Sequence, residues 1–474
     1  MKKIILITLL LFSFITACGQ KESPPLPTAA AAATLPPLPE GANAVIVVEE
    51  EAPVTEPDTA VSSTTSLPTA VPQTITIQPT QFAYTYQQPD GNRIVFGQGN
   101  LPNLTPLDIP LGGTPQWVTA LPLGEAVMWG VVLEDGRTQA FLVENGAATE
   151  VAATELMPNV APVMTVSEDW QQAGFLNPPV AEAGGNSPVV YDDAGNLAYS
   201  NAAGELFLLN VRDGNIVQVD AEILPDGRLL FDENGRLLIL SDPTGRYDHG
   251  VLGDALEGGG VILVETGGAE PTIATHIVIP EPQVIEGIMP LWVDWDGDGQ
   301  REIIVTLSDA NQGAQIVLYS EDGEQLAAGE PIGRGQRWRH QIAVAPFGPN
   351  GEMELATVLT PHIGGTVGFY QWEGDQLNIV AELSGYTSHV INSRSLDMAM
   401  AGDFNGDGRP ELLLPTDDRT QLGGIQRTAD GAEAAYQLDL PGQMATNLAG
   451  ATLVSGDTAV GVGLDNGVLR VWQP

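Results

Sequence analysis

The sequence predicts an all-β fold, and three observations lead to that class. Short apolar runs of strand length recur along the chain, hairpin-type turn residues separate them, and no segment has the spacing of an amphipathic helix. The 54 glycines and 36 prolines fit a chain with many tight turns. Typical turn pairs are Asp135-Gly136, Asn145-Gly146, Asn234-Gly235 and Asn466-Gly467.

Residues 1–17 have the features of an export signal. Two lysines precede an apolar run over residues 4–15, which is shorter than the roughly 20 residues that a membrane-spanning helix needs. Ile15-Thr16-Ala17-Cys18 resembles a bacterial lipobox, and this resemblance implies that Cys18 is lipidated and becomes the first residue of the mature protein. An ordinary signal peptide is the alternative. Cys18 is the only cysteine, so the mature chain has no internal disulfide.

Residues 18–79 are rich in proline, alanine, threonine and serine. Such a segment buries too little apolar surface to offset the entropy lost on ordering, and its prolines favour extended conformations. The composition therefore predicts a disordered stalk between the lipid and a folded domain over residues 80–474.

A repeated pattern within residues 80–474 selects one β architecture. A polar turn leading into an apolar strand begins near residues 192, 232, 294, 345 and 403, at intervals of about 50 residues. That interval suits a four-stranded blade, so we expect a β-propeller of seven blades, with eight as the alternative. We expect the last strand, over residues 467–472, to close the ring against sequence near residues 80–100.

Two of these turns are strongly acidic, over residues 294–302 and 403–411. Each has oxygen-bearing side chains at positions 1, 3 and 5 and glycines at positions 4 and 6, a pattern suited to Ca²⁺. They are not EF-hands, because position 12 is Val305 or Leu414 and the closing acid stands at position 9.

The two acidic turns resemble the calcium loops of FG-GAP and VCBS repeats, which form blades of integrin-type propellers. The resemblance implies two Ca²⁺ sites, with side-chain ligands at positions 1, 3, 5 and 9 and a carbonyl ligand at position 7. The implied ligands are Asp294, Asp296, Asp298, the Gln300 carbonyl and Glu302, then Asp403, Asn405, Asp407, the Arg409 carbonyl and Glu411. A hairpin turn without metal is the alternative.

The chain is strongly acidic, with 60 Asp and Glu against 18 Lys and Arg and a formal net charge of −42. Such a surface repels nucleic acid and anionic lipid head groups, so we expect no nucleic-acid partner and membrane attachment through the lipid only.

Histidines and arginines gather in the C-terminal half of the chain. If these residues lie at one end of their blades, they converge on the central channel. They would then suit a carboxylate-bearing ligand or a three-histidine Zn²⁺ site, or would only hydrogen-bond to backbone. A glycine-bounded loop over residues 246–257 is a further ligand-binding candidate. The candidate residues are Arg339, His340, His362, His389 and Arg394, together with His249, Asp254 and Glu257.

No sequence motif identifies an enzyme. The chain lacks a G-x-S-x-G elbow, an H-E-x-x-H helix and a phosphate-binding glycine loop, and no catalytic residue is assigned. We therefore expect an exported, lipid-anchored, calcium-binding propeller that faces away from the cytoplasm and binds a protein or glycan. The alternatives are an extracellular hydrolase or lyase on the same scaffold and a structural subunit of an envelope complex.

Overall fold

The computed structural model describes residues 82–179, 184–253 and 255–474, all of which belong to the unit Ile75–Pro474. The predicted export signal, Cys18, the stalk and Asp254 lie outside these residues. Within the described part, no helix is long and apolar enough to span a membrane. Among the described residues, one 3-10 turn, η1 (Leu101–Asn103), accompanies 33 strands, so the all-β prediction is confirmed.

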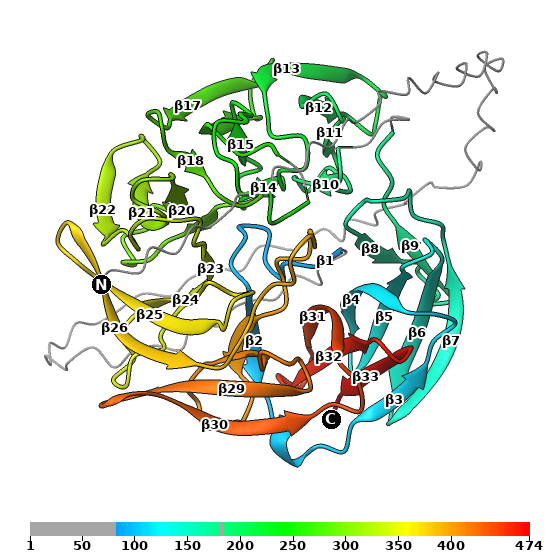
Figure 1. Ribbon diagram of the computed structural model, residues 1–474. Helices are drawn as coiled ribbons and strands as arrows, with labels where there is room; N and C mark the ends of the chain where they lie inside the picture. Colours follow the sequence, from blue (N-terminus) through cyan, green and yellow to red (C-terminus); the bar gives the residue numbers. More distant parts are fainter. Residues whose placement is uncertain (1–81, 180–183, 254) are drawn as a thin grey trace, which may run out of the picture. The chain divides into compact units, whose positions relative to one another are not determined.

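The described residues form a β-propeller (Figure 1). Four of its antiparallel blades follow one another through the middle of the chain; each has four strands, except that the innermost strand of the third blade is divided into two short ones. Their strands are β10 (Val189–Val190), β11 (Leu197–Ser200), β12 (Glu205–Leu209) and β13 (Ile216–Glu222); β14 (Leu230–Phe231), β15 (Leu237–Ser241), β16 (Gly260–Glu265) and β17 (Thr272–Val278); β18 (Val284–Ile285) and β19 (Leu291–Val293) followed by β20 (Glu302–Ser308), β21 (Gln315–Ser320) and β22 (Gln325–Gly329); and β23 (Arg339–Ala345), β24 (Glu354–Leu359), β25 (Thr366–Glu373) and β26 (Gln376–Ser384).

Three further four-stranded blades and one smaller sheet complete the ring. The blades are β4 (Pro115–Leu123), β5 (Ala126–Leu133), β6 (Thr138–Glu144) and β7 (Ala147–Ala153); β27 (Met400–Asp403), β28 (Glu411–Pro415), β29 (Gln421–Thr428) and β30 (Gly431–Asp439); and β31 (Met444–Thr452), β32 (Thr458–Leu464), β33 (Val468–Trp472) and β3 (Leu107–Pro110). The smaller sheet joins β1 (Ala83–Tyr84), β8 (Val163–Val166) and β9 (Gln172–Phe175). The described residues thus form seven four-stranded blades and a three-stranded sheet between β7 and β10, so the ring has eight places, the alternative count rather than the favoured seven.

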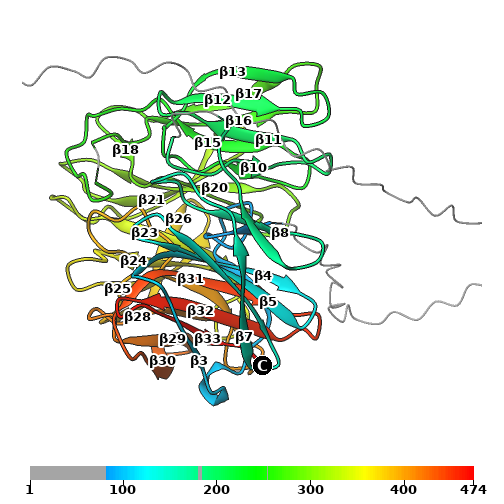
Figure 2. The same ribbon diagram turned by 90° about the vertical axis from the view of Figure 1, so that its right-hand side faces the viewer.

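Burial along each blade explains its strand sequences. The innermost strands β19 and β23 are buried along their whole length, because both of their faces pack within the ring. The outermost strand β26 is mostly exposed or half-buried, with Leu377 and Ala381 as its buried residues, as expected for a strand with one face toward solvent. Neighbouring sheets pack face to face, as Figure 2 shows from the side.

The last strand closes the ring by pairing with early sequence. β33 pairs antiparallel with β3, so that Val468 lies opposite Pro110. The closing partner therefore lies slightly later in the chain than the expected residues 80–100.

Residues 82–98 instead run through the middle of the ring. The carbonyls of Pro89, Asp90 and Arg93 accept hydrogen bonds from the backbone of three different blades, at Phe231 (3.0 Å), Trp292 (3.0 Å) and Ala401 (2.7 Å). Asn92 exchanges side-chain hydrogen bonds with the backbone of Val344 in a fourth blade, at 3.0 and 3.1 Å. β2 (Ile94–Gln98) then pairs parallel with β27. This central segment therefore ties several blades together.

A buried ion triad lies against the central segment. Asp397 accepts from Arg93 at 2.8 Å and from Arg228 at 2.6 Å, and all three side chains are at most 3% exposed. Burial by itself would raise the pKa of Asp397, but the two guanidinium groups outweigh it and hold that pKa at about 2.

Candidate functional site

The up-and-down course of each blade separates the candidate residues between two ends of the ring. We call the end at which the innermost strands begin the proximal end, and the end at which they stop the distal end. The acidic turns lie at the distal end, since one joins β19 to β20 and the other joins β27 to β28. The histidine-bearing connections lie at the proximal end.

The two acidic turns share one conformation. Gly297 and Gly299 have φ of +79° and +88°, and Gly406 and Gly408 have φ of +83° and +85°. These angles favour glycine, which explains both glycines of the repeat. The first acid of each turn receives two backbone N–H groups; Asp294 accepts from Gly297 at 2.8 Å and from Gly299 at 3.1 Å.

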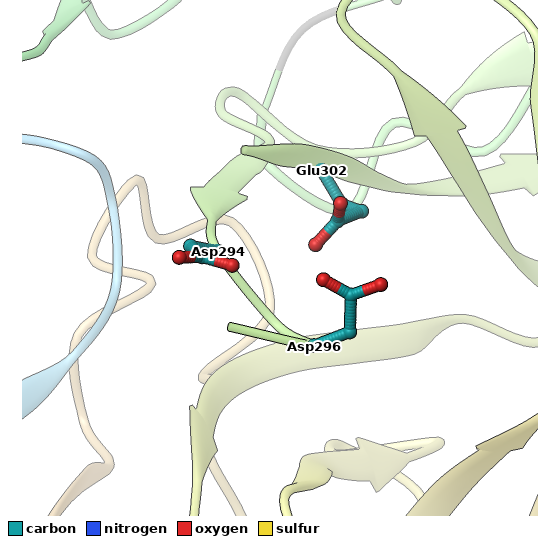
Figure 3. A group of neighbouring side chains, drawn as sticks. All are labelled: Asp294, Asp296 and Glu302. Atoms are coloured by element: carbon teal, nitrogen blue, oxygen red, sulfur yellow. The ribbon is translucent and has the colours of Figure 1, made fainter. Parts of the chain in front are cut away.

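Three carboxylates gather in each turn. One oxygen of each of Asp294, Asp296 and Glu302 lies within 4.8 Å of the others, and Figure 3 shows the three side chains around a common space. The second turn groups Asp403, Asp407 and Glu411 in the same way. Six of the ten implied ligands are therefore brought together.

Two other implied side-chain ligands have structural partners in these turns. Asp298 accepts from the backbone N–H of Gln300 at 2.7 Å. The Asn405 amide donates to Glu411 at 2.6 Å, and Gln426 donates to Asp407 at 2.7 Å. The second turn thus has fewer carboxylates and more amide donors than the first.

The closing acid of each turn is buried at the start of a strand. Glu302 is 4% exposed and Glu411 is 0% exposed. Burial, together with the neighbouring aspartates, raises the pKa of Glu302 to about 7 and that of Glu411 to about 8. A bound cation would reverse this effect, because it stabilises the ionised form.

The equivalent turns of other blades contain their own hydrogen-bond donors. The turn between β23 and β24 keeps a buried closing acid, Glu354, which pairs with Arg427 of the adjacent blade at 2.9 Å. In the turn between β14 and β15, Asp232 pairs with Arg236 at 2.7 Å. Within the described residues, no arginine or histidine forms an ion pair with Glu302 or Glu411. The two acidic turns are therefore the ones suited to an external cation.

Four histidines meet at the proximal end, around the buried Trp338. Its ring stacks on His340 at 4.6 Å between centroids and contacts His389 edge-on at 5.2 Å. His362 lies 5.4 Å from His389 and 6.5 Å from His249. The structure therefore confirms the convergence expected for three histidines and adds His249 from another blade.

Burial favours the neutral form of three rings in the histidine cluster. Burial lowers the pKa of His389 to about 4, and burial likewise lowers the pKa values of His340 and His362. Three-ligand groups suited to a metal occur only in the two acidic turns within the described residues. The three-histidine Zn²⁺ arrangement is therefore absent from this part of the chain.

The remaining candidates lie beside this cluster or away from it. Arg339 points to the carbonyl of Glu330 at 2.6 Å, on the other side of its strand from His340. Arg394 pairs with Asp226 at 2.9 Å. Glu257 is 5% exposed and accepts from the Gly287 N–H at 3.4 Å.

A cavity of about 860 Å³ opens at the proximal end. It is lined by connections from most of the blades and by residues 390–395. Its charged lining residues include Glu134, Arg394, Arg419 and Asp465. Sequence reasoning had singled out Arg394 but not Arg419, which lies in a hairpin turn with no distinguishing motif.

Comparison with known proteins supports the fold only. No family model and no curated protein matches the chain. A europium-containing methanol dehydrogenase is similar in structure with a TM-score of 0.50 and 9% identity, over 81% of this chain and 90% of the other. BamB from Moraxella catarrhalis has 12% identity and a TM-score of 0.37, over 78% and 100% of the two chains. The β-propeller domain of Cps50 (Swd1) from Myceliophteria thermophila has 10% identity and a TM-score of 0.39, over 78% and 100%.

Proposed function

We propose that this protein is an exported, lipid-anchored β-propeller, stabilised by Ca²⁺ at two FG-GAP-like turns, that binds a protein or glycan at its proximal end. The proposal is based mainly on Glu302 and Glu411, two buried carboxyl groups that form no ion pair with an arginine or histidine of the described residues. The scaffold is a closed ring, and its proximal connections line a concave surface of the kind that binds ligands.

The donor set of the acidic turns fits Ca²⁺. Hard divalent cations take carboxylate and carbonyl oxygens, and each turn brings three carboxylates to one place. The first turn has four acids at positions 1, 3, 5 and 9, whereas the second has three and an asparagine. We therefore expect the first turn to bind Ca²⁺ more tightly, because affinity rises with the number of charged ligands.

Thermal unfolding of the intact acylated protein in detergent, with chelator and with excess Ca²⁺, tests the calcium sites. A ligand bound only by the folded state adds about 2.7 kcal/mol when present at 100 times its Kd. Ca²⁺ should raise the Tm, and Asp296→Asn and Asp407→Asn should each reduce that rise. Asp193→Asn, an exposed acid in the turn between β10 and β11, is the control and should leave it unchanged. No rise in Tm with Ca²⁺ would contradict the calcium sites.

Binding of acidic oligosaccharides tests the proximal cavity. Arg394 and Arg419 line the cavity and supply donors that suit a carboxylate. Arg394→Gln and Arg419→Gln should weaken binding about tenfold, as expected for about 1.4 kcal/mol of lost interaction. Arg137→Gln is the control, since Arg137 lies outside the cavity lining and pairs with exposed Asp135. A glycan ligand at the cavity is contradicted if the parent protein binds no acidic oligosaccharide. It is also contradicted if all three variants lose affinity equally.

A further inference from the structure

The histidine cluster contains groups that the proposed function does not use. It gathers four of the chain's five histidines at the proximal end, opposite to the acidic turns; three come from connections and His340 comes from the start of β23. His249 and His362 are partly exposed, whereas His340 and His389 are each 1% exposed. The two outer imidazoles are therefore accessible to solutes and rest on two buried ones.

Glu286 fixes the orientation of His249. The His249 ring contacts Glu286 Oε1 through Nδ1, and the Ser308 hydroxyl donates to the other oxygen of Glu286. Since a carboxylate accepts, Nδ1 of His249 carries the proton of this bond, which leaves Nε2 as the nitrogen that can bind a metal. A carboxylate behind a histidine is the arrangement that orients metal-binding histidines.

A hydrogen-bond relay fixes His362 in the same way. Nε2 of His389 donates to the carbonyl of Ser393 at 2.7 Å, so Nδ1 of the neutral His389 is an acceptor. That nitrogen lies 3.4 Å from Nδ1 of His362. His362 therefore donates from Nδ1, and its Nε2 also keeps a lone pair.

We propose that Nε2 of His249 and Nε2 of His362 together bind one divalent transition-metal ion of the Zn²⁺ class, with water completing its coordination. The two ring centroids are 6.5 Å apart. Two imidazoles on one tetrahedral Zn²⁺ have centroids roughly 5 Å apart, given N–Zn distances of about 2.0–2.1 Å. The rings therefore need to approach by somewhat more than 1 Å when the ion binds.

Two buried polar atoms of the histidine cluster would gain a hydrogen-bond partner from a hydrated ion. Nε1 of Trp338 and Nε2 of His340 have no hydrogen-bond partner among the described residues, although both side chains are 1% exposed. A buried donor without a partner costs free energy, and a metal-bound water would give it one. Trp338 lies 6.4 Å from His362 between ring centroids, so its ring adjoins the proposed site.

Ligand chemistry separates this site from the acidic turns. Neutral imidazole nitrogens suit Zn²⁺, Cu²⁺ and Ni²⁺, whereas carboxylates and carbonyls suit Ca²⁺. The two kinds of cation are therefore assigned to opposite ends of the ring.

Calorimetric titration of the intact protein with Zn²⁺, in saturating Ca²⁺ to occupy the acidic turns, tests this site. We expect one equivalent of Zn²⁺, with affinity reduced about tenfold or more by His249→Ala and by His362→Ala. His276→Ala is the matched control, because His276 is an exposed histidine on β17 that pairs with Asp242 at 2.6 Å. It should leave the affinity unchanged.

Electron paramagnetic resonance with Cu²⁺ gives a second readout that does not depend on stability. Bound Cu²⁺ should show coupling to two imidazole nitrogens in the parent protein and in His276→Ala, and should lose it in the other two variants. The proposal is overturned if Zn²⁺ does not bind in saturating Ca²⁺. It is equally overturned if the His249→Ala, His362→Ala double variant retains the parent affinity and spectrum.

Discussion

Replacing Arg427 tests the physical argument behind the calcium sites. Arg427 and Glu354 form two hydrogen bonds, at 2.9 and 3.2 Å, and their side chains are 7% and 2% exposed. Arg427→Met removes the cation but keeps an apolar chain against Phe369. Glu354 would then be in the same situation as Glu302 without a bound cation.

The expected loss of stability is large, because one partner of a buried ion pair remains charged. Breaking such a pair costs about 3–5 kcal/mol, whereas replacing both partners by neutral groups costs much less. Arg427→Met should therefore lower the free energy of unfolding by about that amount, and Glu354→Gln combined with Arg427→Met should recover most of it. Arg470→Met is the control, because Arg470 pairs with Asp108, which is 43% exposed. This substitution should lower the free energy of unfolding by at most about 1 kcal/mol.

Urea unfolding followed by tryptophan fluorescence in saturating Ca²⁺ measures these differences. The loss in Arg427→Met should be smaller at pH 5 than at pH 8, because an unpaired buried carboxyl takes up a proton. The reasoning is refuted if Arg427→Met costs less than about 1 kcal/mol. It is also refuted if the double variant is no more stable than Arg427→Met. Either result would mean that a buried acid at this position needs no cation.

Three further predictions concern the centre of the ring, acid stability and the anchor. Asp397→Asn leaves two buried guanidinium groups without a carboxylate. It should lower the free energy of unfolding, measured with urea at pH 7, by about 3–5 kcal/mol. Asp193→Asn, at an exposed position, is the control and should leave the stability unchanged. The pKa of Asp397 is about 2 in the folded state and near 4 in the unfolded state. Its ion pairs therefore contribute fully to the free energy of unfolding above about pH 4, and this contribution should be lost as the pH falls through about 2. Acid unfolding followed over this range measures the loss. His389 has a folded pKa of about 4, below the usual value near 6.5, so stability should fall on acidification between these values and His389→Gln should flatten that fall. Cys18→Ala should move the protein from the membrane fraction to the soluble fraction; an unchanged distribution would contradict the lipid anchor.

The local features of the fold were predictable from sequence. The all-β class follows from strand-length apolar runs and glycine turns, and both signals depend on residues close together in the chain. The carboxylates of the first acidic turn are within nine residues, so their convergence needs only the two glycines of left-handed conformation. The same repeat predicts a propeller, although it favoured seven blades and the ring has eight places.

Other features depend on contacts between distant residues. The partner of Glu354 is Arg427, 73 residues away on the next blade, and no local pattern marks that arginine as a counter-ion. The central segment is another case. Its sequence reads as the closing strand, but β3 takes that place and Asn92 bonds to β23 instead.

The histidine cluster shows the same division within one site. Sequence spacing predicted that His340, His362 and His389 lie in consecutive blades, which is wrong, since His340 and His362 both belong to the β23–β26 blade. The three rings nevertheless meet at one end of the ring. That His249 joins them was not predictable, because it depends on how the β14–β17 blade faces the β23–β26 blade.

The sequence by itself therefore determined the strand content, the repeat and the two acidic turns, since backbone turns and strand periodicity are set by neighbouring residues. The tertiary structure decided which buried charges have a protein partner and which do not. It also decided which histidines expose a lone pair, because burial and ion pairing depend on side chains that only the closed ring brings together.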